Sequence, residues 1–256
     1  MKLFFLVLAK DKAHVQDKIR ELENLNVQYK IVCGDRLDHP NVAYQIPRGK
    51  YAAVNFGASL IPKETDIVAM NDVDTRIHNF DKALEHFKDE KVALVFGTEK
   101  VDEGPQKSFL RILNPIRNKI LIAGTGELMF IRKDVFDEIG PLPPCKAEDT
   151  YVLFKVQEKG YEAVFCENCY AETRRTKTVQ KEEPYRRKTV AGIYQALSYS
   201  KPPPLTRLFY ILLPLLSPIL LISGQKGYFW MRGILLGFLD YARGDRSGMW
   251  RTDYME

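Results

Sequence analysis

Two aspartates, Asp72 and Asp74, follow the apolar run at 65–70 and are separated by one residue. The run is typical of a buried strand, and at the end of a strand both side chains can reach a common point. Paired carboxylates with no neighbouring cation suit a hard divalent cation that also holds a diphosphate. The alternative is an acidic turn whose side chains accept hydrogen bonds from local backbone N–H groups.

The elements that must position these aspartates follow a strand–helix–strand pattern, predicted at 3–9, 14–25 and 28–32. This pattern implies parallel pairing, and ligands of open α/β sheets bind outside the carboxyl ends of the strands. Asp35, Asp72 and Asp74 follow such ends, so we expect them to line one cleft. Further strands are predicted at 42–46, 65–70, 92–97, 128–131 and 161–165, and helices at 51–60, 80–88, 109–122, 133–139 and 151–159.

The composition bounds the class of protein. The chain has 256 residues, 45% apolar and 28% charged, which fits one large core with a tail or two small domains. Its net charge is +5, and basic residues crowd 174–207, which indicates an anionic partner: phosphates, a nucleic acid or a membrane surface. The four cysteines include one C-x-x-C without a second pair. They predict reduced structural thiols on the cytosolic side, with zinc or redox chemistry as the alternative.

The C-terminal part has a different pattern. A proline run at 202–204 precedes two apolar stretches, 208–223 and 228–242, and the first contains Pro214 and Pro218. The first stretch is short for a spanning helix, which needs about 20 residues. Aromatic and basic residues beside apolar runs suit the bilayer interface. We therefore predict a domain at 1–200 and a helical membrane-association segment at 201–256. A buried helical hairpin and a full membrane span are the alternatives.

Several stretches together resemble the family 2 glycosyltransferases. Residues 48–57, RGKYAAVNFG, are similar to the family's RGK-x-x-A-x-N-x-G stretch, and residues 71–74 contain its D-x-D. Residues 124–132 resemble its acceptor-side strand, Glu148-Asp149 its E-D pair, and residues 232–244 the tail of membrane-associated members. The resemblance runs from Leu3 to about Leu197. It implies the GT-A fold, an α/β, Rossmann-like and mostly parallel sheet flanked by helices.

The resemblance also implies ligands and the residues that hold them. Asp74, with help from Asp72, would bind Mn²⁺ or Mg²⁺ and so neutralise the leaving diphosphate of a UDP- or GDP-sugar. Arg48 and Lys50 precede a helix and would bind phosphate, although both residue types also suit an ordinary surface. Asp35 would accept from the base or ribose of the nucleotide, with a turn aspartate as the alternative.

The E-D pair would carry the proton transfer. Asp149 would act as general base towards an acceptor hydroxyl, and Glu148 beside it would raise its pKa towards a useful value. The alternative role, capping the following helix, is compatible with the first.

One motif departs from the family. Where polymerising members have Q-x-x-R-W, this chain has YRRKT at 185–189, which keeps positive charge and favours transfer of a single sugar. Arg187 and Lys188 would face the diphosphate; a solvated basic helix face or a contact to anionic lipid is equally compatible.

These features predict an inverting, metal-dependent glycosyltransferase on the cytoplasmic face of a membrane. The expected acceptor is a polyprenyl phosphate or a lipid-linked saccharide, and we expect no nucleic-acid partner. The rivals are a nucleotidyltransferase and a non-catalytic basic membrane-docking module. A nucleotidyltransferase would favour a Gly-rich loop after the first strand, where residues 9–12 contain no glycine.

Overall fold

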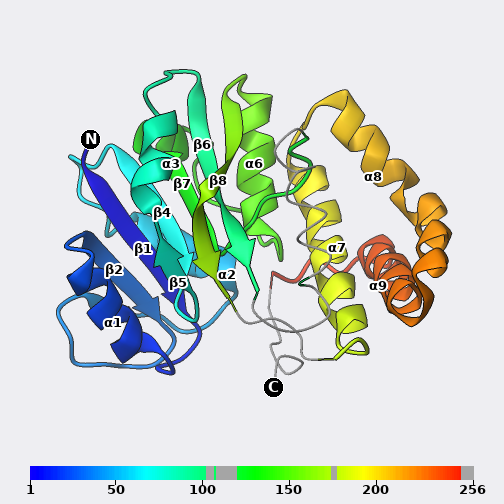
Figure 1. The fold of residues 1–256 in the computed structure, drawn as a ribbon, viewed down its shortest axis with the longest axis horizontal. Coiled ribbons are helices and arrows are strands. Elements are labelled where there is room, and N and C mark those ends of the chain that lie inside the picture. The colour runs from blue at the N-terminus through cyan, green and yellow to red at the C-terminus, as the bar shows by residue number, and fades with distance from the viewer. Residues whose placement is uncertain (102–106, 108–119, 174–177, 249–256) are drawn as a thin grey trace.

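The computed structural model describes residues 1–101, 107, 120–173 and 178–248. Eight strands form one sheet in the order β3–β2–β1–β4–β7–β6–β8–β5 (Figure 1). Their bounds are β1 (Leu3–Ala9), β2 (Gln28–Cys33), β3 (Val42–Tyr44), β4 (Ile67–Asp72), β5 (Arg76–His78), β6 (Val92–Lys100), β7 (Leu128–Arg132) and β8 (Glu162–Glu172).

The direction of the strands determines which residues meet at one edge of the sheet. Strands β1, β2, β3 and β4 are parallel, β6 is parallel to β8, and β7 runs antiparallel between β4 and β6. The carboxyl end of β4 at Asp72 therefore lies beside the beginning of β7, where Asn71 pairs with Leu128. This antiparallel strand brings the loop before it, at 124–127, to the edge where the aspartates lie.

Helices cover both faces of the sheet because its central strands are apolar on both sides. In β1, Phe4 and Leu6 contribute to one core and Phe5 and Val7 to the other, as the alternation of side chains along a strand requires. Burying a large apolar side chain of this kind stabilises the fold by roughly 1.5–3 kcal/mol. The first core also takes in α2 (Lys50–Ala58), α5 (Lys133–Ile139) and α6 (Glu148–Glu158), and the second takes in α1 (Val15–Asn24) and α3 (Phe80–His86).

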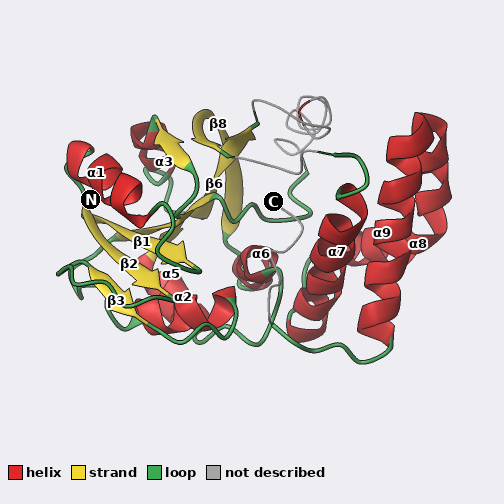
Figure 2. Cartoon of the chain, turned by 90° about the horizontal axis from the view of Figure 1, so that it is seen from below, coloured by secondary structure: helices red, strands yellow, loops and turns green. Residues whose placement is uncertain are grey.

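Three further helical segments extend the molecule beyond α6: α7 (Glu182–Tyr199), α8 (Pro204–Leu216) and α9 (Gly224–Ala242), with the 3₁₀ segment η1 (Ser217–Ser223) between the last two. In Figure 2, α9 lies between α7 and α8. Two glycines permit close packing, since a Cβ at Gly233 would be 2.6 Å from the Cβ of Arg186, and one at Gly237 would be 2.4 Å from the backbone oxygen of Arg187.

The outer face of this helical layer is apolar and exposed. Leu205, Ile211, Leu215, Ile219 and Ile222 all point outward, with Leu215 76% and Ile222 88% exposed. Among the described residues, one continuous helical stretch, Pro204–Ala242, is long and apolar enough to cross a membrane, by length and composition alone. Both predicted apolar stretches are therefore helical, and the first presents most of its side chains to solvent.

Most of the predicted elements are present, with differences at their ends. The predictions missed the short edge strand β5, and they ended β6 and β8 too early. The predicted start of the helix at 151 was wrong: α6 begins at Glu148, so Glu148 and Asp149 lie in its first turn. The predicted helix at 109–122 lies almost wholly outside the described residues.

Candidate active site

The site is assembled around the ammonium group of Lys50 at the beginning of α2. Its Nζ lies 2.8 Å from Asp72 Oδ1, 3.1 Å from Asp72 Oδ2 and 3.1 Å from Glu148 Oε1. It also donates to the backbone oxygen of Gly126 at 3.4 Å. Lys50 thereby joins three segments that are far apart in the sequence: the end of β4, the loop before β7 and the first turn of α6.

Asp149 faces the same point from α6. A Cβ built on Gly126 would lie 2.8 Å from Lys50 Nζ, 3.3 Å from Asp149 Oδ2 and 3.5 Å from Glu148 Oε1. The other Asp149 oxygen, Oδ1, accepts a hydrogen bond from the backbone N–H of Thr150 at 2.7 Å. The missing side chain of Gly126 thus leaves a place where one cation and two carboxylates converge.

The charges of this cluster shift one another's ionisation. Burial, and then the neighbouring Glu148, raise the pKa of Asp149 to about 6, against the opposing effect of Lys50. Burial alone would lower the pKa of Lys50, but the charges of Asp72, Glu148 and Asp149 raise it well above its ordinary value. At neutral pH the cluster therefore holds a charged lysine beside a carboxylate that is ionised and still basic.

Glu148 has one satisfied and one unsatisfied oxygen. The residue is only 4% exposed, and Oε1 pairs with Lys50. Its Oε2 is buried and has no hydrogen-bond partner within the described part of the chain. A buried carboxylate oxygen in this state is costly unless a ligand or water donates to it.

Asp74 differs from Asp72 in being open to solvent. It is exposed, and it makes no hydrogen bond or ion pair with any residue in the described ranges. Asp72 is partly buried and turned towards Lys50. The two carboxylates stand on one turn, and a divalent cation held by one or two carboxylates plus substrate phosphates fits this donor set.

Asp35 and Arg48 lie outside this cluster. The Asp35 side chain accepts a hydrogen bond from the backbone N–H of Lys12 at 3.0 Å, which ties the end of β2 to the loop after β1. Arg48 is exposed and lines a surface hollow with Tyr44, Gln45 and Ile46.

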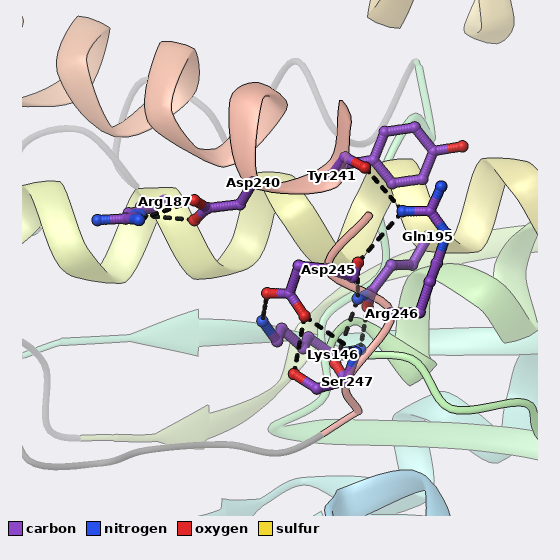
Figure 3. A network of polar contacts seen from close by, with 8 residues as sticks. All are labelled: Lys146, Arg187, Gln195, Asp240, Tyr241, Asp245, Arg246 and Ser247. Carbon is purple, nitrogen blue, oxygen red and sulfur yellow. Dashed lines mark hydrogen bonds and ion pairs between the residues drawn. The ribbon is translucent and has the colours of Figure 1, made fainter. Parts of the chain in front are cut away.

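Arg187 and Lys188, two of the basic residues of α7, make contacts away from this cluster. Arg187 forms a two-pronged ion pair with Asp240 of α9, with Nη2 2.7 Å from Oδ1 and Nε 2.5 Å from Oδ2 (Figure 3). Lys188 is buried, and its ammonium lies 5.6 Å from the centre of the Tyr185 ring. The structure therefore groups Lys50, Asp72, Glu148 and Asp149 together and gives Arg187 a contact with the C-terminal helix.

The segment after α9 returns to this site. Asp245 pairs with Lys146, two residues before Glu148, at 2.5 Å, and its Oδ1 accepts from Ser247 (Figure 3). Gln195 of α7 donates to the backbone oxygens of Asp245 and Ser247 at 3.1 and 3.2 Å. The loop that leads into α6 is thus fastened to both α7 and the chain beyond α9.

Neither Gly126 nor Lys18 was predicted as a site residue, although Gly126 lies in the stretch at 124–132 that resembles the acceptor-side strand. Gly126 is the last residue of the GTG sequence at 124–126. Because it has no side chain, Lys50 and Asp149 can approach the backbone at this position. Lys18 of α1 is 1% exposed and bonds to the loop of the two aspartates. A signal for Lys18 is present in the sequence, because it occupies an inward position of a helix whose other inward residues are Val15, Ile19 and Leu22.

Comparison with known proteins identifies the fold. No protein-family model matches the sequence, and no curated protein has a matching sequence. Among solved structures, the chain is similar to the mannosyltransferase PcManGT from Pyrobaculum calidifontis in complex with GDP-Man and Mn²⁺. The TM-score is 0.71 at 15% identity, over 95% of this chain and 88% of that one.

Two further structures agree. Glucosyl-3-phosphoglycerate synthase from Mycobacterium tuberculosis, in complex with Mn²⁺, UDP and glucosyl-3-phosphoglycerate, gives a TM-score of 0.52 at 13% identity, over 77% of this chain and 80% of that one. S. aureus TarS gives 0.58 at 11% identity, over 82% of this chain and 43% of that one. With its sheet order and flanking helices, the chain has the GT-A fold, as predicted from the sequence.

Proposed function

We propose that the protein is a metal-dependent glycosyltransferase that moves a single sugar from a UDP- or GDP-sugar to an acceptor at a membrane. The observation that carries the proposal is the cluster at the sheet edge, where Lys50 joins Asp72 to Glu148 beside the basic carboxylate of Asp149. The solved structures with bound Mn²⁺ and nucleotide or nucleotide sugar support it through their common fold.

The donor end of the site is the aspartate turn. Asp74, with help from Asp72, would hold Mn²⁺ or Mg²⁺, and Asp74 is open to solvent, as a ligand of an incoming metal–nucleotide complex must be. When bound, the metal supplies charge neutralisation for the diphosphate as the bond to the sugar breaks. Arg48, in the loop before α2, would contact the phosphate. Asp35, in the loop after β2, would contact the nucleoside.

The acceptor end is the first turn of α6. An acceptor oxygen bonds to the anomeric carbon from the side opposite the diphosphate, the carbon–oxygen bond to the diphosphate breaks, and the acceptor's proton passes to Asp149 Oδ2. This displacement inverts the anomeric configuration. With a pKa of about 6, Asp149 is ionised at neutral pH and remains basic enough to take a proton.

The neighbours of Asp149 orient the reacting groups. Lys50 keeps the carboxylates of Asp72 and Glu148 in place, because its donors are directed at both. If the acceptor is a polyprenyl phosphate, it is already ionised, and Asp149 then orients it instead of deprotonating it.

The exposed apolar face of α8 and η1 would place this site at a lipid bilayer. The whole stretch Pro204–Ala242 is long enough to cross a membrane, but η1 divides it into α8 and α9. Helix α8 alone spans about 20 Å, less than the roughly 30 Å of a hydrocarbon core, and we therefore favour docking on the surface. On this basis the chain divides between residues 200 and 201 into a glycosyltransferase domain and a membrane-association segment. The segment would dock on the cytoplasmic face of the membrane. A lipid-linked saccharide or polyprenyl phosphate is the acceptor class that such docking would serve.

Isothermal titration tests the donor half of the proposal. UDP- and GDP-sugars are titrated into the protein with and without Mn²⁺, and into Asp74→Ala. Asp81→Ala, which removes an exposed aspartate from α3, away from the turn, is the control. We expect metal-dependent binding of one nucleotide class by the wild type and the control, and none by Asp74→Ala. Absence of metal-dependent binding by the wild type would remove the enzyme assignment.

A further inference from the structure

A buried lysine lies directly behind the aspartate turn. Lys18, on α1, is 1% exposed, and its Nζ donates to Asn71 Oδ1 at 2.8 Å and to the backbone oxygen of Thr75 at 2.5 Å. The third partner is Glu21 Oε2 at 2.7 Å. Asn71 and Thr75 are the residues on either side of the segment that carries Asp72 and Asp74. One ammonium therefore fastens both ends of the turn.

The turn is closed by further hydrogen bonds within the same ring. Asn71 Nδ2 donates to Thr75 Oγ1 at 2.8 Å and to the backbone oxygen of Glu127 at 2.5 Å. Thr75 Oγ1 donates to the backbone oxygen of Asp72 at 2.9 Å. Glu21, the partner of Lys18, accepts from the backbone N–H of Ile77 at 2.6 Å. None of these hydrogen bonds uses the side-chain carboxylate of Asp72 or Asp74.

Stability alone is a weak explanation for an ammonium in this position. Taking a charge out of water costs several kcal/mol even when it is paired, so a buried lysine is a weak stabiliser compared with an apolar side chain of similar size. Burial lowers the pKa of Lys18, and the charges of Glu21, Asp72 and Asp74 act in the opposite direction. The two aspartates repel each other when no metal is bound, and a cation behind the turn offsets that repulsion.

We propose that Lys18 is a positioning residue for the metal site: its ammonium holds the turn at 71–75 in the conformation that presents Asp72 and Asp74 to a divalent cation. The inference rests on the proposed function and adds a residue to it. Lys18 touches no substrate; it acts through Asn71 and Thr75. Residues that hold metal ligands from behind typically change metal affinity by 10–100-fold when they are replaced.

The test measures metal binding directly. Free Mn²⁺ is followed by its electron paramagnetic resonance signal during titration of the full-length protein, with saturating GDP in one series and UDP in another. The variant is Lys18→Met, which keeps the length of the side chain and removes its charge and donors. The matched control is Lys82→Met, which removes the same charge from an exposed pair with Glu85 on α3. Circular dichroism and thermal unfolding report whether each variant is folded.

The proposal predicts a Kd for Mn²⁺ about 10–100-fold higher in Lys18→Met and unchanged in Lys82→Met. It also predicts that more Mn²⁺ is needed for half-maximal transfer, while the rate at saturating Mn²⁺ stays within a few-fold of the wild type. A folded Lys18→Met with wild-type Mn²⁺ affinity overturns it. A wild type that binds no Mn²⁺ with either nucleotide overturns the proposed function first.

A second variant answers the case in which Lys18→Met does not fold. Thr75→Val keeps the shape of the side chain and removes the hydroxyl that bonds Asn71 and Asp72 within the ring. Weaker Mn²⁺ binding in Thr75→Val supports the proposal, because the ring and not the ion pair alone would set the geometry of the carboxylates. Unchanged binding overturns it.

Discussion

A methyl group at Gly126 is the sharpest single perturbation that the site offers. In Gly126→Ala the new Cβ would lie 2.8 Å from Lys50 Nζ. An ordinary contact is about 3.5 Å, so the ammonium must retreat by about 0.7 Å. This movement would disrupt the ion pairs that the ammonium makes with Asp72 at 2.8 Å and with Glu148 at 3.1 Å. A displacement on this scale in an active site costs about 10²-fold in rate.

The same substitution leaves the fold intact. The atom that the methyl meets is the far end of a flexible side chain, and a glycine-to-alanine change at a compatible backbone position stabilises by about 0.4–1 kcal/mol. Gly124→Ala is the contrast, because its Cβ would lie 2.6 Å from the backbone carbon of Asp149, which cannot retreat without moving α6. We expect Gly124→Ala to lower the midpoint of thermal unfolding by more than Gly126→Ala, because it displaces backbone atoms and not the end of a side chain.

The assay is initial-rate transfer from the donor identified by titration, with thermal unfolding alongside. A double-mutant cycle tests whether the methyl group acts through Lys50. If it does, adding Gly126→Ala to Lys50→Met lowers the rate no further. Full activity in Gly126→Ala would refute the reasoning, because it would mean that the contacts of Lys50 do not matter to the reaction. Full additivity in the cycle would refute the route through Lys50.

Four further predictions concern the ionisation of Asp149, the stability of Asp149→Asn, the apolar face of α8 and η1, and the ion pair of Asp245. With a hydroxyl acceptor, the transfer rate rises through about pH 6 as Asp149 ionises and is level above it; Asp149→Asn removes this rise together with most of the activity. Because burial and Glu148 raise the folded-state pKa of Asp149 above its unfolded value, ionisation lowers the stability of the wild type as pH rises through that interval. Asp149→Asn should therefore unfold no more easily than the wild type at pH 7, and earlier unfolding would contradict this sign. Leu215→Asp with Ile222→Asp should abolish flotation with anionic phospholipid vesicles while donor binding persists; undiminished flotation would remove the docking face. Asp245→Asn deprives Lys146 of its counter-ion and should lower the free energy of unfolding by about 1 kcal/mol at pH 7 in urea titrations. Burial would raise the pKa of Asp245, but the hydrogen bonds from Lys146 and Ser247 lower it. The difference in unfolding free energy between Asp245→Asn and the wild type should therefore vanish as pH falls below about 4 and Asp245 is protonated. A difference that persists at low pH would contradict the ion-pair explanation.

The sequence is informative where the chemistry is local. The apolar run before Asp72 predicted a buried strand that ends in carboxylates, and β4 ends at Asp72. The helical pattern at 133–139 matches α5 from end to end. The glycine of the helix end at 160 adopts a positive φ of 83°, which a turn after a helix requires. Each of these depends on neighbours within a few residues along the chain.

The arrangement of the site depends on contacts that no local pattern encodes. Lys50 was expected to bind phosphate, but its distance to Glu148 depends on how β7 and α6 pack against the end of β4. The edge strand β5 has only three residues and pairs with β8 through the fold, so its own sequence carries little signal. Arg187 was expected at the diphosphate, and its pairing with Asp240 depends on the close packing of α9 on α7. The role of these residues towards the nucleotide stays a prediction.

One measurement tests the central claim most directly: a crystal structure of the protein soaked with Mn²⁺ and the nucleotide selected by titration, with anomalous scattering at the manganese edge. The account predicts a manganese peak bonded to the carboxylate of Asp74, with Asp72 alongside and the diphosphate completing the coordination. Manganese and nucleotide bound elsewhere, with both aspartates turned away from them, would contradict it.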